Sequence, residues 1–115
     1  MKRLTLLLFI LILFVQTSFG QSAASDFLAS PSQYLDKKIT IAAIGGYATC
    51  IALADYVVFD VETANGNIFV MVSSRKSNNF VSGLPRKGSG SSKSYSGAFT
   101  TFQDGQSHRY ALQLD

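Results

Sequence analysis

The segment 56–72, YVVFDVETANGNIFVMV, constrains the fold most strongly. Val57, Phe59 and Val61 alternate with Tyr56, Val58, Asp60 and Glu62, which is the period of a half-buried strand. Asn65-Gly66 then interrupts the alternation, and because both residues accept positive φ angles the pair predicts a hairpin turn. The second strand of the hairpin follows at 68–72. We therefore expect a small sheet built around this hairpin.

The first twenty residues have the parts of a secretory signal peptide. Lys2-Arg3 provides a positive start, and ten uninterrupted apolar residues follow at 6–15. Ten residues rise only about 15 Å as a helix, whereas a membrane span needs about 20 residues. We therefore predict a signal peptide at 1–20, a flexible leader at 21–25 and one domain at 26–115. The domain is expected to be exported to the periplasm or the cell exterior, with no membrane span after signal removal.

The charge of the exported domain is close to neutral. The chain has ten Lys and Arg residues against seven Asp and Glu residues, and Lys2 and Arg3 leave with the signal peptide. The remaining net charge of +1 gives no global argument for nucleic acid or an anionic membrane. Cys50 is the only cysteine. We interpret it as a buried small hydrophobic residue rather than as a reactive thiol.

Further strands and one helix complete the expected domain. Ser30-Pro31 is typical of the start of a short helical turn. Gly45-Gly46 predicts a bend in the first strand, because glycine permits the close backbone approach that a bulge requires. Asp104-Gly105 predicts a second hairpin. The remaining strands are expected at 39–44, 97–102 and 109–114, a short helix at 75–84 and a loop at 85–94. The segment 47–55 either continues the bent first strand or forms a loop.

This order of elements resembles the OB-fold, a five-stranded Greek-key barrel with a helix between strands three and four. The segment 30–41, SPSQYLDKKITI, is similar to the entry of many small exported bacterial OB-fold proteins, in which a proline, two spacers and a tyrosine precede a lysine and a β-branched strand. Asp36 stands where that group commonly has glycine, and aspartate tolerates a turn. The resemblance covers residues 26–115 and implies an all-β, OB-fold-like barrel.

The sequence carries no catalytic or metal-binding constellation. His108 is the only histidine. A zinc site would need further histidine or cysteine ligands, and a serine triad would have only His108 as its base. Asp60 and Glu62 point the same way from one strand, and we interpret them as a solvated outer face rather than as a glycosidase dyad or a cation site. The glycine-rich stretch 88–92 lacks the lysine of a phosphate loop. We therefore expect a protein without catalysis, cofactor or metal.

The outer face of the central hairpin is the predicted binding face. OB barrels bind ligands on this face and through the flanking loops. An exposed apolar patch there would be typical of a partner surface. The alternative is that Phe27 and Leu28 of the amino-terminal turn cover part of it. The residues of the predicted binding face are Tyr56, Val58, Phe69 and Met71.

A basic segment follows the central hairpin. Between residues 75 and 93 there are five basic side chains and no acidic ones, and the segment is either a solvated loop or a patch for an anionic ligand. Asp60 and Glu62 on the predicted binding face would repel phosphate. We therefore predict an envelope module that binds a protein partner, with oligonucleotide or oligosaccharide binding through strands two and three and the segment 75–93 as the alternative. The predicted basic patch comprises Arg75, Lys76, Arg86, Lys87 and Lys93.

Overall fold

Five β-strands make up more than half of residues 24–114, which are the residues that the computed structural model describes. The predicted signal peptide at 1–20 and residues 21–23 of the predicted leader lie outside the described residues. The elements are α2 (Ala24–Ala29), α3 (Pro31–Tyr34), β1 (Lys38–Ala52), β2 (Tyr56–Thr63), β3 (Gly66–Ser73), the 3-10 turn η1 (Ser74–Lys76), α4 (Ser77–Gly83), β4 (Lys93–Asp104) and β5 (Ser107–Gln113). No helix in this part of the chain has the length and apolar character needed to span a bilayer.

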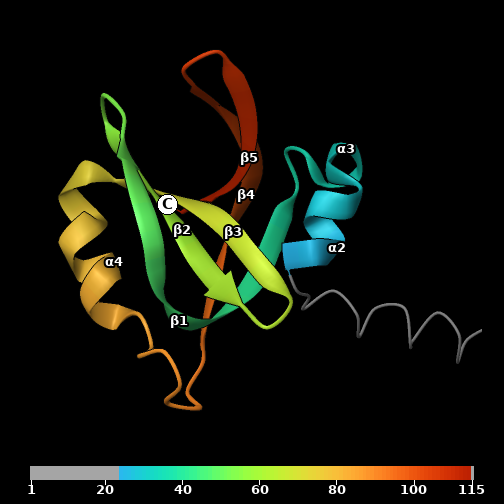
Figure 1. Ribbon diagram of the computed structural model, residues 1–115. Coiled ribbons are helices and arrows are strands. Elements are labelled where there is room, and N and C mark those ends of the chain that lie inside the picture. The colour runs from blue at the N-terminus through green and yellow to red at the C-terminus, as the bar shows by residue number, and fades with distance from the viewer. Residues whose placement is uncertain (1–23, 115) are drawn as a thin grey trace, which may run out of the picture.

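The strands form one sheet that closes into a ring in the order β1-β2-β3-β5-β4 (Figure 1). β3 and β5 run parallel over Phe69–Met71, and the other neighbouring strands are antiparallel. β1 and β4 close the ring from Lys38 opposite Ala98 to Ala43 opposite Lys93. A mostly β fold with a short helix between the third and fourth strands is thus confirmed.

The central hairpin is confirmed, but its turn differs from the prediction by one residue. Thr63 pairs with Gly66, so Ala64-Asn65 forms the two-residue loop. Gly66 has φ 125°, whereas Asn65 does not have positive φ. The expectation that both Asn65 and Gly66 supply positive φ angles is therefore wrong. The Thr63 hydroxyl donates a hydrogen bond to the Gly66 carbonyl. This bond joins the two residues that flank the loop.

β1 is longer than predicted and bends where Gly45-Gly46 predicts a bend. Its register against β2 shifts between Ala43 and Tyr47 and again between Tyr47 and Cys50. Four steps along β1 therefore face two steps along β2, and the extra residues bulge opposite Glu62. A Cβ atom at Gly45 would lie 2.8 Å from Glu62 Oε1, so a larger residue there would displace the Glu62 side chain. The ambiguous segment 47–55 is strand as far as Ala52.

The other boundaries shift by a few residues. α2 begins at Ala24, inside the predicted leader, and β4 begins at Lys93, inside the predicted loop. The predicted helix at 75–84 is η1 followed by α4. Asp36 has φ 64°, a left-handed conformation that aspartate tolerates better than most residues.

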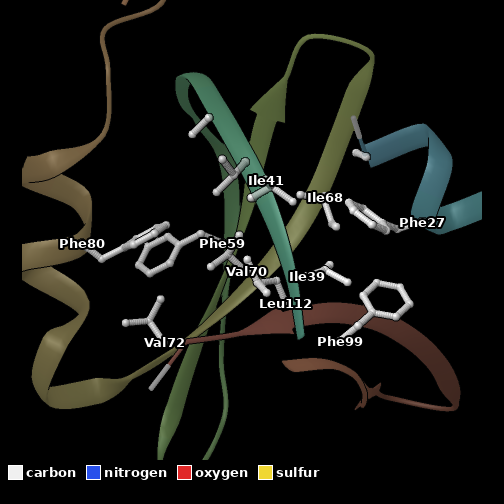
Figure 2. Packing of buried hydrophobic residues seen from close by; sticks show 13 residues of the cluster. Phe27, Ile39, Ile41, Phe59, Ile68, Val70, Val72, Phe80, Phe99 and Leu112 are labelled. Atoms are coloured by element: carbon white, nitrogen blue, oxygen red, sulfur yellow. The ribbon is translucent and has the colours of Figure 1, made fainter. Parts of the chain in front are cut away.

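The main hydrophobic core fills the ring and is covered from two sides by helices. Figure 2 shows Phe80 of α4 and Phe27 of α2 entering this core from opposite sides. The Phe80 ring lies 5.2 Å from that of Phe59, and the Phe27 ring lies 6.2 Å from that of Phe99. At the start of α2, the Ala24 amide donates a 3.4 Å hydrogen bond to the Thr63 hydroxyl. The two helices therefore pack against opposite sides of the ring, and α2 is also hydrogen-bonded to the central hairpin.

Candidate binding groove

Two adjoining hollows of about 480 and 440 Å³ lie between the bend of β1 and the segment that follows α4. We call them together the β1 groove. One wall is β1 over 44–48, and the opposite wall is the segment 84–92 with Val81 of α4. Glu62 and Lys87 line both hollows, so the two are continuous at these side chains. In Figure 1 the segment after α4 (orange) runs down from the helix toward the start of β4.

Tyr47 supplies the aromatic surface of the groove. Its side chain is 41% exposed, although Tyr47 follows the bulge in a strand that is otherwise half buried. The Tyr47 ring meets the Phe59 ring edge-on at 5.0 Å, and Phe59 in turn packs against Phe80. One edge of Tyr47 is therefore held by the core, while its remaining surface is open to a ligand.

The charged side chains of the groove have opposite signs. Arg86 and Lys87 are exposed on one wall, and Glu62 is half buried between the hollows. The Glu62 side chain makes no hydrogen bond or ion pair with the described residues. The carboxylate is therefore available to accept hydrogen bonds from a ligand, and the two cations are available to an anionic group.

The structure divides the predicted basic patch between the two ends of α4. Arg75 and Lys76 lie in η1 before the helix, whereas Arg86 and Lys87 follow it. The Lys93 ammonium lies above the Tyr95 ring, 5.4 Å from its centroid, and next to Gly83 at the end of α4. Of the five basic residues, Arg86 and Lys87 therefore line the β1 groove.

The predicted binding face is a packed cluster rather than an exposed patch. Tyr56, Val58, Phe69 and Met71 share one face as expected, but Val58 is 0% and Met71 6% exposed. Phe102 of β4 and Ala111 of β5 complete the cluster, and the end of β1 packs against it through Ile51 and Leu53. The expectation of four exposed side chains is therefore wrong, because segments distant in sequence cover the face. We call this set of residues the outer cluster.

The amino-terminal turn does not provide this cover. Phe27 belongs to the main core, where its ring lies 5.0 Å from that of Tyr34, and Leu28 is 41% exposed. The alternative in which these two residues shield the outer face is therefore wrong.

The rim of the outer cluster combines aromatic and polar groups. The half-buried Phe69 ring lies 5.4 Å from the Phe102 ring, and the Arg109 guanidinium lies 5.7 Å from the Phe69 centroid. Arg109 Nε also donates to Asp104 Oδ2 at 3.0 Å. These contacts hold the exposed edge of Phe69 in place.

The remaining polar candidates are scattered. Cys50 is exposed, which contradicts the interpretation as a buried residue, because it lies beyond the part of β1 that β4 covers. His108 is exposed on β5 opposite Gln103. Across residues 24–114, no three His, Cys, Asp or Glu side chains gather in a way that could hold a metal ion.

Three parts of the groove are not predicted from the sequence. Tyr47 lies in the ambiguous segment 47–55, Leu84-Pro85 lies at the boundary between the predicted helix and loop, and Glu62 is predicted to lie on a solvated face. Gly45-Gly46 immediately before Tyr47 was the available signal, since a bulge re-aims the side chains that follow it. No protein-family model matches the chain, and no curated protein matches its sequence. The chemistry of the groove is therefore the basis for a functional proposal.

Proposed function

We propose that this chain is an exported, non-catalytic binding module of the cell envelope with an OB-fold-like Greek-key barrel. The closed order β1-β2-β3-β5-β4 and the position of α4 between β3 and β4 support the fold assignment. The positive start and the short apolar run at 6–15 support export. Mass spectrometry of the exported protein is expected to give a mature start near Gln21, and full-length protein retained in the membrane would contradict this.

The β1 groove carries the binding proposal. It is concave, and it brings the open surface of Tyr47 together with a carboxylate and two cations. A mainly apolar hollow of a few hundred Å³ with a few convergent polar groups is the usual form of a ligand site. The serines of the groove, Ser91 and Ser92, have no histidine beside them among the described residues, which supports binding rather than acyl transfer.

The test compares two equally exposed apolar side chains. Tyr47 and Leu28 are both 41% exposed, but only Tyr47 lines the groove. The exported protein would be screened against peptide and oligosaccharide fractions of the envelope by amide chemical-shift mapping. We expect a bound ligand to shift groove residues, Tyr47→Ser to lose at least tenfold in affinity and Leu28→Ser to match the parent protein. A ligand that binds Tyr47→Ser as tightly as the parent would overturn the proposal.

The outer cluster is a second candidate surface, favoured by the half-exposed ring of Phe69 between Phe102 and Arg109. It is also the face on which the resemblance places ligands, whether a protein, an oligonucleotide or an oligosaccharide. Phe69→Ser is expected to weaken such a complex, with Arg86→Ser as the groove control. We rank it second because its largest side chains are already packed against one another.

A further inference from the structure

Among residues 24–114, no strand pairs with one edge of β1 beyond its bend. β1 pairs with β4 from Lys38 to Ala43, and no later residue of β1 faces β4. On its other edge β1 continues to pair with β2, through Tyr47 and from Cys50 to Ala52. No other backbone hydrogen bond in residues 24–114 reaches 45–50. The backbone groups on this edge are therefore available to a further strand.

The β1 groove borders this open edge and also reaches Glu62 of β2 and Asn67 of β3. Lys93 is opposite Ala43, so the residues preceding Lys93 would extend β4 along 45–50 if they stayed in the sheet. They turn away instead, with φ 80° at Gly88 and 77° at Gly90. The segment that turns away lines one hollow together with Ile44, and residues 84–87 line the other together with Tyr47.

Two features that block edge pairing are missing from the middle of this edge. Residues 47–50, Tyr-Ala-Thr-Cys, include no charged residue and no proline, and all four are exposed. Natural sheets usually protect an open edge with lysine, proline, a bulge or a covering segment. At 47–50 the protection comes from the register shifts of β1 and from the segment 84–87 across the groove, which leave the exposed residues able to accept a partner strand.

We propose that an extended segment of a partner polypeptide, carrying acidic side chains, adds to the sheet along β1 over 45–50. This inference rests on the proposed function and names its ligand. Main-chain hydrogen bonds to the β1 edge provide affinity, and side-chain pockets provide selectivity. Tyr47 offers an apolar contact, and Arg86 and Lys87 pair with carboxylates of the segment.

Glu62 is compatible with this occupant. Its half-buried carboxylate lies where the hollows meet and accepts hydrogen bonds from N–H groups of the added segment. The same carboxylate repels a polyanion with closely spaced charges, because some of those charges must lie next to it. Charge in the groove therefore favours a polypeptide with spaced acidic residues over a uniformly sulfated or phosphorylated polymer.

The experiment uses two blocked hexapeptides of alternating glutamate and valine that differ only by N-methylation of every backbone amide. Both carry the same charge, but the methylated peptide has no amide N–H on either edge and cannot pair as a strand. Titration into the exported protein is followed by amide chemical shifts and hydrogen exchange at 45–50. We expect the unmethylated peptide to bind, slow exchange at 45–50 and bind at least tenfold more tightly than its methylated form.

Variants that remove two charges test the electrostatic part. Arg86→Ser with Lys87→Ser is expected to weaken the unmethylated peptide about tenfold and to reduce its salt dependence. Lys37→Ser with Lys38→Ser removes the same charge from exposed residues outside the groove and is expected to leave affinity unchanged. An unchanged urea midpoint in both double variants establishes that folding is preserved.

The alternative outcomes separate this inference from the function it rests on. Equal binding of both peptides, or binding only of a sulfated oligosaccharide, would overturn strand addition and leave a groove that binds anions. Concentration-dependent dimerisation that protects 45–50 without peptide would show that a second copy occupies the edge, and would also overturn it. If neither peptide nor oligosaccharide shifts any groove residue, the proposed function itself fails.

Discussion

The hydroxyl of Tyr95 is a buried polar group without a hydrogen-bond partner in the described part of the chain. The Tyr95 ring packs 5.0 Å from that of Phe80, which places the hydroxyl under the end of α4 near Gly83. Leaving a buried hydroxyl unpaired costs about 1–3 kcal/mol. We expect Tyr95→Phe to raise the free energy of unfolding by about 1 kcal/mol, measured by urea denaturation at pH 7. A loss of stability would show that the hydroxyl has a partner in solution.

The same burial makes Tyr95 sensitive to alkali. Desolvation raises the pKa of the Tyr95 phenol above its usual value of 10.0. The unfolded chain therefore loses this proton at a lower pH than the folded protein, and stability is expected to fall as pH rises past about 10. Tyr95→Phe should flatten this decline in the urea midpoint, whereas Tyr110→Phe should retain it. Equal alkaline slopes in the two variants would contradict the assignment.

The central hairpin depends on Gly66 rather than on the Asn65-Gly66 pair. Gly66 has φ 125°, a conformation that a β-branched side chain strains, whereas Asn65 does not have positive φ. We expect Gly66→Val to lower the free energy of unfolding by about 1 kcal/mol or more. Asn65→Ala is expected to change it by less than about 0.5 kcal/mol. Equal losses in the two variants, measured by thermal and urea unfolding, would contradict the observed register.

Strands and turns were largely predictable because their signals are local. Alternation over Tyr56–Glu62 and the glycines at 45–46 depend only on neighbouring residues, and the structure confirms both the strand and the bend. The exposure of Val58 and Met71 was not predictable in this way. The burial of these two side chains depends on Phe102 and on the end of β1, which contact the outer cluster only in the closed ring.

The groove was also not predictable from the sequence, because it forms only in the folded molecule. Tyr47, Glu62 and Lys87 come from three separate segments, and only tertiary packing brings them together. Their residue types carry no shared motif, because a binding groove does not require the fixed spacing of a metal or phosphate site. The predicted basic segment 75–93 nevertheless includes Arg86 and Lys87, which line the groove.

Ring closure brings β4 close to both of its neighbours at Gly97. Gly97 is buried and faces Ile39 of β1, and the adjacent Ala98 pairs with Gln113 of β5. A Cβ atom at Gly97 would collide with the backbone carbonyl oxygen of Gln113. Unlike the contact at Gly45, this one involves backbone, so rotation of a side chain cannot relieve it. A larger residue must displace β4 from β5 or from β1.

Gly97→Ala is therefore expected to lower the free energy of unfolding by about 2 kcal/mol or more, since overpacking that shifts backbone typically costs about 1–3 kcal/mol. Gly46→Ala is the matched control. Gly46 is also in a strand, but a Cβ atom there meets nothing within 4 Å, so we expect a change of less than about 0.5 kcal/mol. Urea denaturation of both variants measures the difference in their free energies of unfolding. Hydrogen exchange at Ile39 and Gln113 that is slower in the parent than in Gly97→Ala would place the disturbance at this part of the ring. Equal midpoints for the two variants would mean that β4 and β5 lie farther apart in solution and that the ring is open at this position.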